Sequence, residues 1–423
     1  MKSIYKVFII VFCCSIACSK KTITPTVSYR LELTPVDTTL FLGATDVSKL
    51  FYHYDEINDK EYLVAYNSSK YNFIVFDYTN GDVISDFDMD TGINSLHIKT
   101  IDSIYIGFNN AFKEKGNVFG IVNSNGDAIK KINLNNIMVI PDIDSNGNFN
   151  LLGNKNIIHL ADNPYSFDNF CILDETMYMN VITKDKKIPN KYDYPILAFI
   201  TLNNDMILKY DYHFPTSYKN SKVSADYVDF VIKKDKKNII NIIISYVLSD
   251  SVHINRLVPK FESNDISLFS DNPDYDSLII KNVASKYRDV NYNESKTRSP
   301  HTNNHLSFKY IYLKYDEFRN CFYRIAVHSP ISADITENME YYKSAAATGM
   351  PALAAKVQNW SIIVSDENLN PICEKIMLAA GNYYPNILVT KNGMGLIDVS
   401  NINNKGVVND IRIVKNSIRL VKQ

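Results

Sequence analysis

Two similar segments, 45 residues apart, constrain the fold of this chain more than any other feature. Asn72–Ile84 aligns without a gap with Asn117–Ile129, and each contains a strand-like run, an Asn-Gly-Asp turn and a second strand-like run. Asn-Gly between alternating apolar residues is the strongest short-range signal for a β-hairpin. Each segment also follows another strand-like run, so the unit has at least three strands in about 45 residues, which is typical of a β-propeller blade. The alternative is coincidence between two ordinary hairpins.

Strand-like runs continue along the rest of the chain. Ile, Val, Tyr and Phe recur in short runs bounded by Asn, Asp, Gly and Ser, which favours strands and turns. Weaker copies of the hairpin follow at residues 197–210, 360–377 and 387–399. The run Ile239–Leu248 is apolar on both faces, as expected for a central buried strand. The sequence therefore predicts an all-β fold, a β-propeller with six or seven blades that forms a single domain over residues 28–423.

Two stretches interrupt this rhythm. Asn264–His305 is polar and contains Asn, Asp and Pro clusters, which predicts long loops between strands. Ile335–Gln358 contains two alanine-rich runs around a Gly-Met-Pro sequence, which predicts a short helical insertion near residues 335–358. Loops of this length are uncommon in a compact domain and often carry function.

The N-terminus has the pattern of a secretory signal. Lys2 and Lys6 form a basic region, and the apolar run Val7–Ala17 follows. A helix that crosses a bilayer needs about 20 apolar residues. This shorter run therefore indicates a signal peptide and not a membrane anchor.

The end of the apolar run matches the signal of a bacterial lipoprotein. A small residue directly precedes Cys18, and Ser15 is another small residue shortly before it. In such signals the cysteine is lipidated and becomes the new N-terminus. We therefore expect a lipoprotein signal peptide over residues 1–17, a palmitate-type lipid anchor on Cys18 and a flexible tether over residues 18–27. The alternative is an ordinary signal peptide cut near Ala17.

The charge balance argues against a nucleic-acid partner. The chain has 45 basic and 46 acidic residues, whereas binding to phosphate backbones needs a concentrated basic surface. The densest basic stretch is Lys233–Lys237, which we interpret as a solvated hairpin tip. Beyond the anchor, Cys171, Cys321 and Cys373 are too widely spaced for a C-x-x-C zinc or redox motif. We interpret all three as buried small apolar groups.

Two loop patterns are weak candidates for metal sites. His301 and His305 are four residues apart, but their surroundings are poor helix sequence, so we interpret them as exposed loop histidines. Asp142–Asn148 resembles a calcium-binding loop, but Gly153 stands where that loop needs its bidentate acid. We interpret this segment as a turn.

Alternating carboxylates give one weak candidate for catalysis. Asp86, Asp88 and Asp90 could share one face of a strand, and hydrolases use such pairs. A solvated strand edge explains them better. The sequence therefore predicts no catalytic residue, no metal site and no cofactor.

The segment Tyr315–Ile325 combines charge with aromatic residues. It predicts a strand, a tight turn and a second strand. The residues that could act together in it are Tyr315, Asp316, Arg319, Tyr323 and Arg324. Cation–π stacking, or an Asp316–Arg319 pair that braces the turn, would be structural. An aromatic and arginine patch can equally bind a sugar, a carboxylate or a peptide, so both interpretations stay open.

The same segment resembles a known signature. Residues 315–324 read Tyr-Asp-x-Phe-Arg-Asn-x-Phe-Tyr-Arg, which is similar to the YDxYRNxYYR signature of lipoproteins grouped as domain of unknown function 4221, a propeller-like family. The similarity continues at residues 360–370 and 389–393, and residues 63–77 match the family's first blade. Cys321 within the signature is a departure. The resemblance implies a propeller-like fold and an envelope location, but no known activity.

The signal and the resemblance together imply a lipoprotein of the bacterial outer membrane, with the membrane as a partner through the lipid anchor. Surface export in related lipoproteins tends to need acidic residues soon after the lipidated cysteine. Here Lys20-Lys21 is followed by no acidic residue until Glu32. We therefore expect the chain to face the periplasm.

Three classes of function follow from these features. The favoured class is a lipid-anchored binding or scaffolding protein of the cell envelope, whose loops around a central channel bind a glycan, a peptide or another envelope protein. The alternative is a hydrolase or lyase acting on a polysaccharide or lactone, which needs carboxylates, or a histidine and a carboxylate, to converge at the channel. The third is a purely structural partner of an outer-membrane complex, which a large exposed apolar patch would mark.

Overall fold

The computed structural model describes the strands and many of the turns between them. The described residues are 28–44, 50–67, 70, 72–88, 93–100, 103–108, 118–122, 128–133, 141–143, 149–151, 158–160, 170–174, 176–183, 195–201, 208–214, 228–257, 278–288, 308–328, 358–401 and 410–423. The predicted signal peptide and tether, with Cys18, lie outside these residues, as do residues 335–357 of the predicted helical insertion. Within the described part of the chain, no helix is long and apolar enough to cross a membrane.

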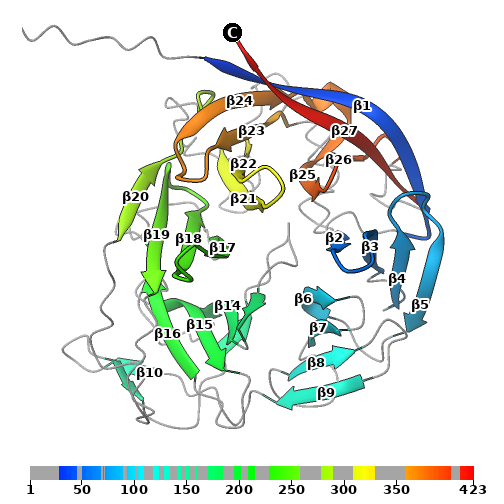
Figure 1. Ribbon diagram of the computed structural model, residues 1–423. Helices are drawn as coiled ribbons and strands as arrows, with labels where there is room; N and C mark the ends of the chain where they lie inside the picture. The colour runs from blue at the N-terminus through cyan, green and yellow to red at the C-terminus, as the bar shows by residue number, and fades with distance from the viewer. Residues whose placement is uncertain are drawn as a thin grey trace, which may run out of the picture.

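The described strands form six antiparallel sheets of four or five strands, arranged as a ring, and one separate strand pair (Figure 1). The first sheet contains β2 (Leu50–Asp55), β3 (Lys60–Asn67), β4 (Asn72–Asp77) and β5 (Val83–Asp88). The second contains β6 (Ile93–Thr100), β7 (Ser103–Phe108), β8 (Val118–Val122) and β9 (Ala128–Asn133). The third contains β12 (Ile158–Leu160), β13 (Phe170–Leu173), β14 (Thr176–Thr183), β15 (Pro195–Thr201) and β16 (Leu208–His213).

The other half of the ring is built in the same way. The fourth sheet contains β17 (Val228–Lys234), β18 (Ile240–Tyr246), β19 (Ser251–Leu257) and β20 (Ile279–Asn282). The fifth contains β21 (Lys309–Asp316), β22 (Cys321–Val327), β23 (Trp360–Ser365) and β24 (Pro371–Met377). The sixth contains β25 (Tyr383–Thr390), β26 (Gly393–Asp398), β27 (Asp410–Lys422) and β1 (Tyr29–Leu42). The separate pair is β10 (Pro141–Ile143) with β11 (Phe149–Leu151), and a 3-10 helix, Ala379–Gly381, precedes β25.

The two ends of the chain close the ring in the sixth sheet. β1 pairs with β27 along almost the whole of both strands, so an N-terminal strand completes a sheet of three C-terminal strands. The amide of Gln423 donates to the carbonyl of Ser28 at 2.8 Å and so holds the two ends together. Phe41 of β1 is completely buried in the core. The ring therefore depends on contacts between the first and last described segments.

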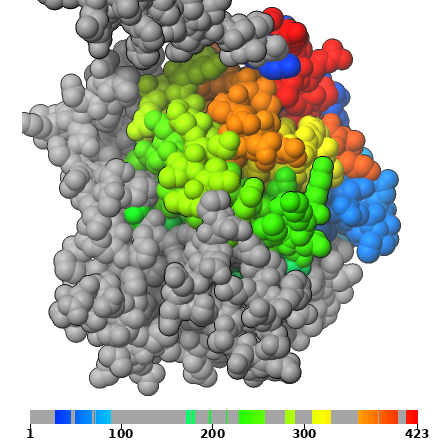
Figure 2. Space-filling view, turned by 60° about the vertical axis from the view of Figure 1, so that its left-hand side comes forward, coloured from blue at the N-terminus to red at the C-terminus, as the bar shows by residue number. Residues whose placement is uncertain are grey.

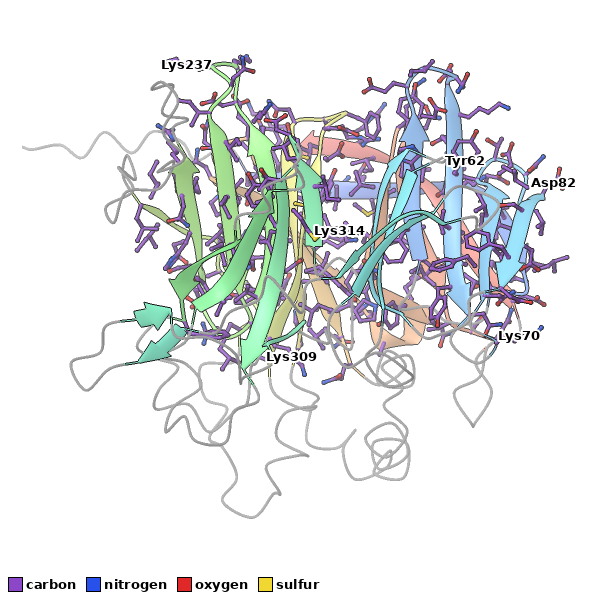
Figure 3. All side chains as sticks on the ribbon, turned by 90° about the horizontal axis from the view of Figure 1, so that it is seen from below. Tyr62, Lys70, Asp82, Lys237, Lys309 and Lys314 are labelled. Carbon is purple, nitrogen blue, oxygen red and sulfur yellow. The ribbon has the colours of Figure 1, made fainter. Side chains whose placement is uncertain are left out.

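The antiparallel order gives the ring two distinct faces. The described first and third hairpin turns of the sheets lie on one face, here called the turn face, which carries residues 56–59, 235–239, 317–320 and 391–392. The described residues of the second turns, and those at the strand ends that lead from one sheet to the next, lie on the other, the connection face. Lys237 lies on the turn face, and Lys70 and Lys309 lie on the connection face (Figure 3).

The core lies between neighbouring sheets. The largest cluster joins apolar residues of the third, fourth, fifth and sixth sheets, and a second cluster joins the sixth sheet to the first. The run Ile239–Leu248 supplies β18, in which every residue from Asn241 to Tyr246 is buried. The prediction of a central buried strand is therefore confirmed.

The repeat seen in the sequence corresponds to equivalent hairpins of neighbouring sheets. Asn72–Ile84 lies in β4 and β5, and Asn117–Ile129 overlaps β8 and β9, which are the third and fourth strands of the first and second sheets. The copies at 197–210 and 360–377 hold the same place in the third and fifth sheets, whereas 387–399 forms the first hairpin of the sixth. The all-β, propeller-like prediction is thus confirmed.

One local prediction was wrong. Asn264–His305 was expected to be loop, but Ile279–Asn282 within it forms β20, the outer strand of the fourth sheet. β20 is the outer strand of its sheet, has only four residues and buries none of them fully. Its apolar run is therefore too short to be recognised as a strand within a polar stretch of sequence.

Candidate functional site

The segment singled out by the sequence forms the β21–β22 hairpin. β21 ends at Asp316 and β22 begins at Cys321. Asn320 closes the turn with a φ of 50°, a left-handed conformation that asparagine tolerates. Asp316 is completely buried, and the backbone amide of Arg319 donates to its Oδ1 at 3.0 Å. The aspartate therefore fixes the shape of this turn on the turn face.

Arg319 joins this hairpin to the sixth sheet. Its Nη1 lies 2.6 Å from Asp316 Oδ2, and the hydroxyl of Tyr323 donates to the same oxygen at 2.9 Å. The Arg319 guanidinium also donates to the carbonyl of Thr390 at 3.1 Å and to the carbonyl of Lys391 at 3.1 Å. Burial raises the pKa of Tyr323, so its hydroxyl stays protonated as a donor. One cation thus links a buried carboxylate to the turn of the next sheet.

Tyr315 faces the fourth sheet at the same turn. Its hydroxyl donates to Asn320 Oδ1 at 2.7 Å, and Lys233 Nζ of β17 donates to that oxygen at 3.0 Å. The Lys233 ammonium also lies 4.2 Å from the centre of the Tyr315 ring, which is a cation–π distance. Tyr315 and Arg319 therefore connect the hairpin to the sheets on either side of it.

Contacts of the same kind join other inner hairpins on the turn face. Lys391 Nζ lies 2.6 Å from Asp59 Oδ1 and 2.9 Å from the hydroxyl of Tyr54, across the junction of the sixth and first sheets. Lys234 forms an ion pair with Asp174 across the junction of the fourth and third sheets. We call the whole set the turn-face belt: Tyr54, Asp59, Asp174, Lys233, Lys234, Arg319, Asn320, Thr390 and Lys391.

An aromatic and acidic cluster lies beside this belt. The ring of Phe318 meets the ring of Tyr54 edge-on, with centroids 5.6 Å apart. Burial raises the pKa of Glu317, and the carboxylates of Glu56 and Asp316 raise it further. Glu317, whose pKa rises in the field of two other carboxylates, is the described turn-face residue to compare with the converging carboxylates that a hydrolase or lyase would need.

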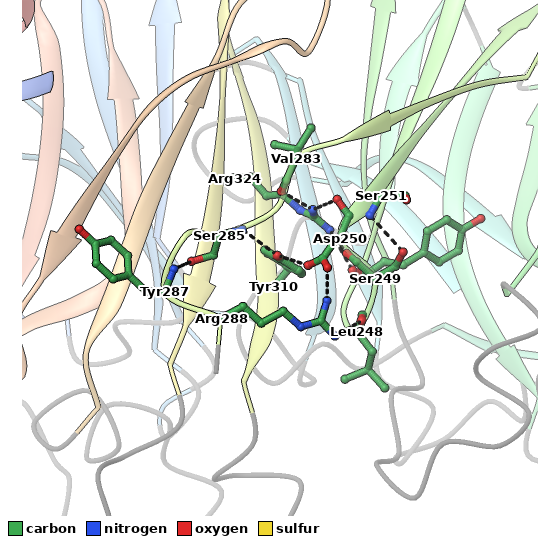
Figure 4. A network of polar contacts seen from close by, with 11 residues as sticks. Leu248, Ser249, Asp250, Ser251, Val283, Ser285, Tyr287, Arg288, Tyr310 and Arg324 are labelled. Atoms are coloured by element: carbon green, nitrogen blue, oxygen red, sulfur yellow. Dashed lines mark hydrogen bonds and ion pairs between the residues drawn. The ribbon is translucent and has the colours of Figure 1, made fainter. Parts of the chain in front are cut away.

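Arg324 points from the other side of β22 toward the fourth sheet (Figure 4). Its side chain is buried, and its Cζ lies 3.5 Å from the centre of the Tyr310 ring. Its guanidinium donates five hydrogen bonds of 2.6–3.1 Å, to the hydroxyl of Ser245 and to the carbonyls of Tyr246, Ser249, Asp250 and Val283. A guanidinium has five N–H groups, so these bonds engage all of its donors.

Asp250 continues this network toward the connection face (Figure 4). Its Oδ1 accepts the hydroxyl of Tyr310 at 2.6 Å, and its Oδ2 forms an ion pair with Arg288. The Tyr310 hydroxyl in turn accepts the amide of Ser285 at 3.0 Å. Burial alone would raise the pKa of Asp250, but the bonds from Arg288 and Tyr310 outweigh it and lower the pKa. This carboxylate is therefore ionised and anchors Arg288.

Glu374 of β24, in the fifth sheet, binds the segment that follows β20 of the fourth sheet. Its Oε1 accepts the hydroxyls of Ser285 and Ser361, both at 2.5 Å, and its Oε2 accepts the amide of Lys286 at 2.6 Å. His328 Nε2 lies 3.1 Å from the Ser361 hydroxyl. Ser361 is completely buried and donates its proton to Glu374. A serine, a histidine and a glutamate therefore meet here without forming an accessible nucleophile.

A stack of flat side chains covers this network at the connection face. The His328 ring stacks on the ring of Phe308 and packs at a tilt against the ring of Tyr287, with its centroid 5.8 Å from each of the other two. The Arg288 guanidinium lies 5.9 Å from the centre of the Phe308 ring. Tyr287 is 48% exposed, and the Arg288 side chain is 35% exposed. We call Tyr287, Arg288, Phe308 and His328 the connection-face platform.

The five residues proposed from the sequence therefore separate into two groups. Asp316, Arg319 and Tyr323 meet around one carboxylate, and Tyr315 lies at the same turn, whereas Arg324 belongs to the network below the platform. Sequence reasoning did not single out the platform itself. Its signal was a second Tyr-Arg pair, at residues 287–288, in a stretch interpreted as loop.

The weaker candidates give little support for chemistry. Asp86 and Asp88 are exposed on the outer strand β5, where Asp86 accepts the side-chain amide of Asn72 at 2.8 Å. Asp90, His301, His305 and residues 144–148 lie outside the described residues. Among the side chains that the structure describes, no three potential ligands are grouped as a metal site.

The three cysteines of the body are all free thiols. Cys321 and Cys373 are buried, and Cys171 is half-buried. Burial raises the pKa of Cys373 to about 11 and also raises the pKa of Cys321. The prediction of buried apolar thiols is confirmed for these two residues.

Comparison with solved structures identifies the fold. A crystal structure of a member of the family of domain of unknown function 4221, from Bacteroides vulgatus, is 17% identical, with a TM-score of 0.60 over 93% of this chain and 99% of that chain. The PQQ-bound aldose sugar dehydrogenase of Streptomyces coelicolor is 9% identical, with a TM-score of 0.40 over 93% and 100% of the two chains. A candidate exported protein of Bacteroides fragilis is 9% identical, with a TM-score of 0.43 over 95% and 98%.

No family model matches the sequence, and no curated protein is similar to it. The resemblance to the lipoproteins of domain of unknown function 4221, first seen in residues 315–324, is confirmed at the level of the fold. At this identity the likeness concerns the architecture of the chain and says nothing about its ligand.

Proposed function

We propose that this chain is a lipid-anchored protein of the cell envelope whose propeller-like domain binds a glycan or a peptide on its connection face. Each of the six sheets in the ring is one blade, and the β1–β27 pair closes the sixth. The two faces then differ in kind. The turn face is tied together by the belt, whereas the connection face presents the platform.

The observation that carries this proposal is the position of Tyr287 and Arg288. Tyr287 leaves about half of its surface exposed while its ring packs at a tilt against His328, so the ring is both held in place and accessible. Arg288 is held by Asp250, so its guanidinium is oriented before any ligand arrives. Preorganised aromatic and arginine side chains of this kind dominate many binding surfaces.

The chemistry of the platform suits either proposed ligand. A sugar ring can stack on the exposed side of Tyr287, and its hydroxyls can accept from Arg288. A peptide can place an aromatic side chain on the same ring and a carboxylate on the guanidinium. By contrast, Arg324 is fully engaged inside the chain and supports the platform from below.

The test is binding by the mature chain to arrays of envelope glycans and to envelope peptides. The variants Tyr287→Ala and Arg288→Gln should each weaken the binding at least about tenfold, as expected for the centre of an interface. Lys70→Gln changes a connection-face residue away from the platform and should leave affinity unchanged. The proposal would be refuted if Tyr287→Ala and Arg288→Gln bound no more weakly than Lys70→Gln. It would also be refuted if the unchanged chain bound neither glycans nor peptides.

The anchor is tested separately. Cys18→Ala should release the full-length protein from the membrane fraction into the soluble fraction, because the acyl chains supply durable attachment. Protease treatment of whole cells should leave the protein intact if it faces the periplasm. Continued membrane association of the Cys18→Ala variant would refute lipidation at this position.

A further inference from the structure

The backbone amides of the platform segment are engaged inside the chain. Those of residues 285–288 donate, in sequence order, to the hydroxyl of Tyr310 at 3.0 Å, to Glu374 Oε2 at 2.6 Å, and to the hydroxyl and carbonyl of Ser285 at 3.1 and 3.5 Å. A protein that binds an extended peptide by strand addition needs free main-chain groups for it. Recognition by the platform therefore depends on its side chains.

The carboxylates beneath the platform are engaged as well. Asp250 accepts the Tyr310 hydroxyl with one oxygen and pairs with Arg288 through the other. Glu374 accepts two serine hydroxyls with Oε1 and the amide of Lys286 with Oε2. Both side chains are half-buried. Each of the four oxygens thus has a partner within the chain, and the negative charges are directed at these partners.

The cations of the platform segment have donors that no described residue accepts. A guanidinium has five N–H groups, and the described hydrogen-bonding partners of Arg288 are Asp250 at Nη1 and the carbonyl of Leu248, 3.4 Å from Nη2. Three N–H groups of this guanidinium are therefore left for a ligand. Lys286 is exposed in the same turn, and its ammonium makes no hydrogen bond or ion pair with a described residue.

The preference for an acidic ligand comes from contact and not from net charge. The cations Lys286 and Arg288 equal in number the acids Asp250 and Glu374, so the attraction at long range is weak. At contact distance the two signs differ, because the acids are engaged and the cations are not. A hydrogen bond from a guanidinium to a carboxylate is roughly twice as strong as one between neutral groups. A ligand carboxylate is thus the group that best matches the unused donors.

The flat side chains of the platform follow one another in a row. Neighbouring members lie 5.8–5.9 Å apart, in the order Tyr287, His328, Phe308 and Arg288. Figure 4 shows the end members, Tyr287 and Arg288, pointing away from each other. Figure 2 shows the fourth and fifth sheets, whose strands lead into these residues, side by side on the outer side of the ring. A ligand that contacts both ends of the row therefore needs several linked units.

We propose that the ligand of the platform is an acidic polysaccharide of linked uronic acid sugars. One sugar ring packs on the exposed ring of Tyr287, and the carboxylate of another binds the free N–H groups of Arg288, with Lys286 beside it. This inference rests on the proposed function and narrows it to one class of ligand.

The test compares oligosaccharides that differ only in charge. Tetramers of galacturonate, glucuronate and mannuronate are titrated into the mature chain at neutral pH by calorimetry, each alongside its methyl ester. Esterification removes the charge and keeps the sugar backbone, so it should weaken the binding of the recognised tetramer at least about tenfold. Arg288→Gln should lower the affinity for the acid by a similar factor and the affinity for the ester much less.

Three further variants separate charge from stacking. Lys286→Gln should weaken the acidic tetramer about two- to fivefold, as expected for an exposed ion pair, and leave the ester unchanged. Tyr287→Ala should weaken the acid and the ester by the same factor, because packing on the ring does not involve the carboxylate. Lys70→Gln removes the same charge elsewhere on the connection face and should have no effect.

The outcomes distinguish this inference from the proposed function. Equal affinity for acids and esters, or equal losses for both in Arg288→Gln, would overturn recognition of a carboxylate and leave a platform that binds neutral sugars. Binding of envelope peptides or neutral glycans, but of none of the uronate tetramers, would overturn the ligand class alone. Binding of neither glycans nor peptides would refute the proposed function itself.

Discussion

The Arg319 guanidinium lies 2.6 Å from the carboxylate of Asp316, which is completely buried. The same guanidinium donates to the carbonyl of Thr390 in the sixth sheet. A residue pair that braces its own turn thus also joins two sheets. The belt repeats this device with different residues at three other junctions, from the third sheet round to the first. Specific polar links at the turns therefore supplement the apolar packing between the sheets.

Arg319→Gln should lower the free energy of unfolding by about 2–4 kcal/mol, because it leaves the buried Asp316 carboxylate without its cation. Urea denaturation of the mature chain measures the change. Arg30→Gln is the matched control, since its ion pair with Glu32 is largely exposed. Removing that pair should cost less than about 1 kcal/mol. Equal losses in the two variants would show that the Arg319 contacts do not stabilise the ring.

Arg324 should be intolerant even of lysine. Lysine keeps the positive charge but cannot supply five donors in one plane or stack flat on the Tyr310 ring. We expect Arg324→Lys and Arg324→Met to lose similar amounts of stability, about 3–5 kcal/mol, because each leaves several buried carbonyls without a donor.

Tyr310→Phe provides the matched comparison for Arg324. It keeps the ring under the guanidinium and removes only the hydroxyl bonded to Asp250 and Ser285. Its cost should be about 1–3 kcal/mol by urea denaturation. If Arg324→Lys proved milder than Tyr310→Phe, the charge of Arg324 would matter more than its geometry.

The sheets could be predicted from the sequence because their signals are local. The Asn80-Gly81 turn sits between β4 and β5, and the same Asn-Gly pair recurs in the sequence 45 residues later, between the residues of β8 and β9. The Asp316–Arg319 pair was also within reach, since the two residues are three positions apart in one hairpin. Both features need only a short stretch of chain to be recognised.

Gly81 links that local signal to the closure of the ring. Its φ is +82°, and a Cβ on it would lie 2.5 Å from the carbonyl oxygen of Leu40 in β1. Gly81→Ala should therefore lower the free energy of unfolding by about 2–4 kcal/mol, from the left-handed backbone and from the clash with β1.

Gly43→Ala is the control for the backbone term in this prediction. Gly43 has a φ of +80°, but its Cβ would meet only the end of the Ile74 side chain, at 3.4 Å. Its cost should be about 1–2 kcal/mol. Thermal unfolding of both variants measures the difference, and a Gly43→Ala variant as unstable as Gly81→Ala would exclude the clash with β1.

Other features could not be predicted, because the interacting residues are far apart in the sequence or because the acceptors are backbone groups that every residue has. β1 and β27 stand at opposite ends of the chain, so their pairing leaves no local pattern. Four of the five acceptors of Arg324 are backbone carbonyls, which any residue type supplies. The platform combines Tyr287, Phe308 and His328 from three separate segments. In each case the arrangement of the sheets around the propeller-like ring, and not the spacing of residues in the sequence, brings the groups together.

His328 gives the last prediction, a loss of stability in mild acid. Burial lowers its pKa below the ordinary 6.5, although Glu374 acts in the opposite direction. As the pH falls through 6.5, the unfolded chain takes up a proton at this histidine before the folded chain does, so the free energy of unfolding must fall. His328→Phe keeps a flat ring in contact with Tyr287 and Phe308 and removes this titration. The difference between urea midpoints at about pH 7.5 and about pH 5 should therefore shrink in the variant. His53 and His253, whose pKa values are also lowered by burial, should preserve part of the dependence. An undiminished difference would mean that His328 takes up its proton equally well in the folded chain.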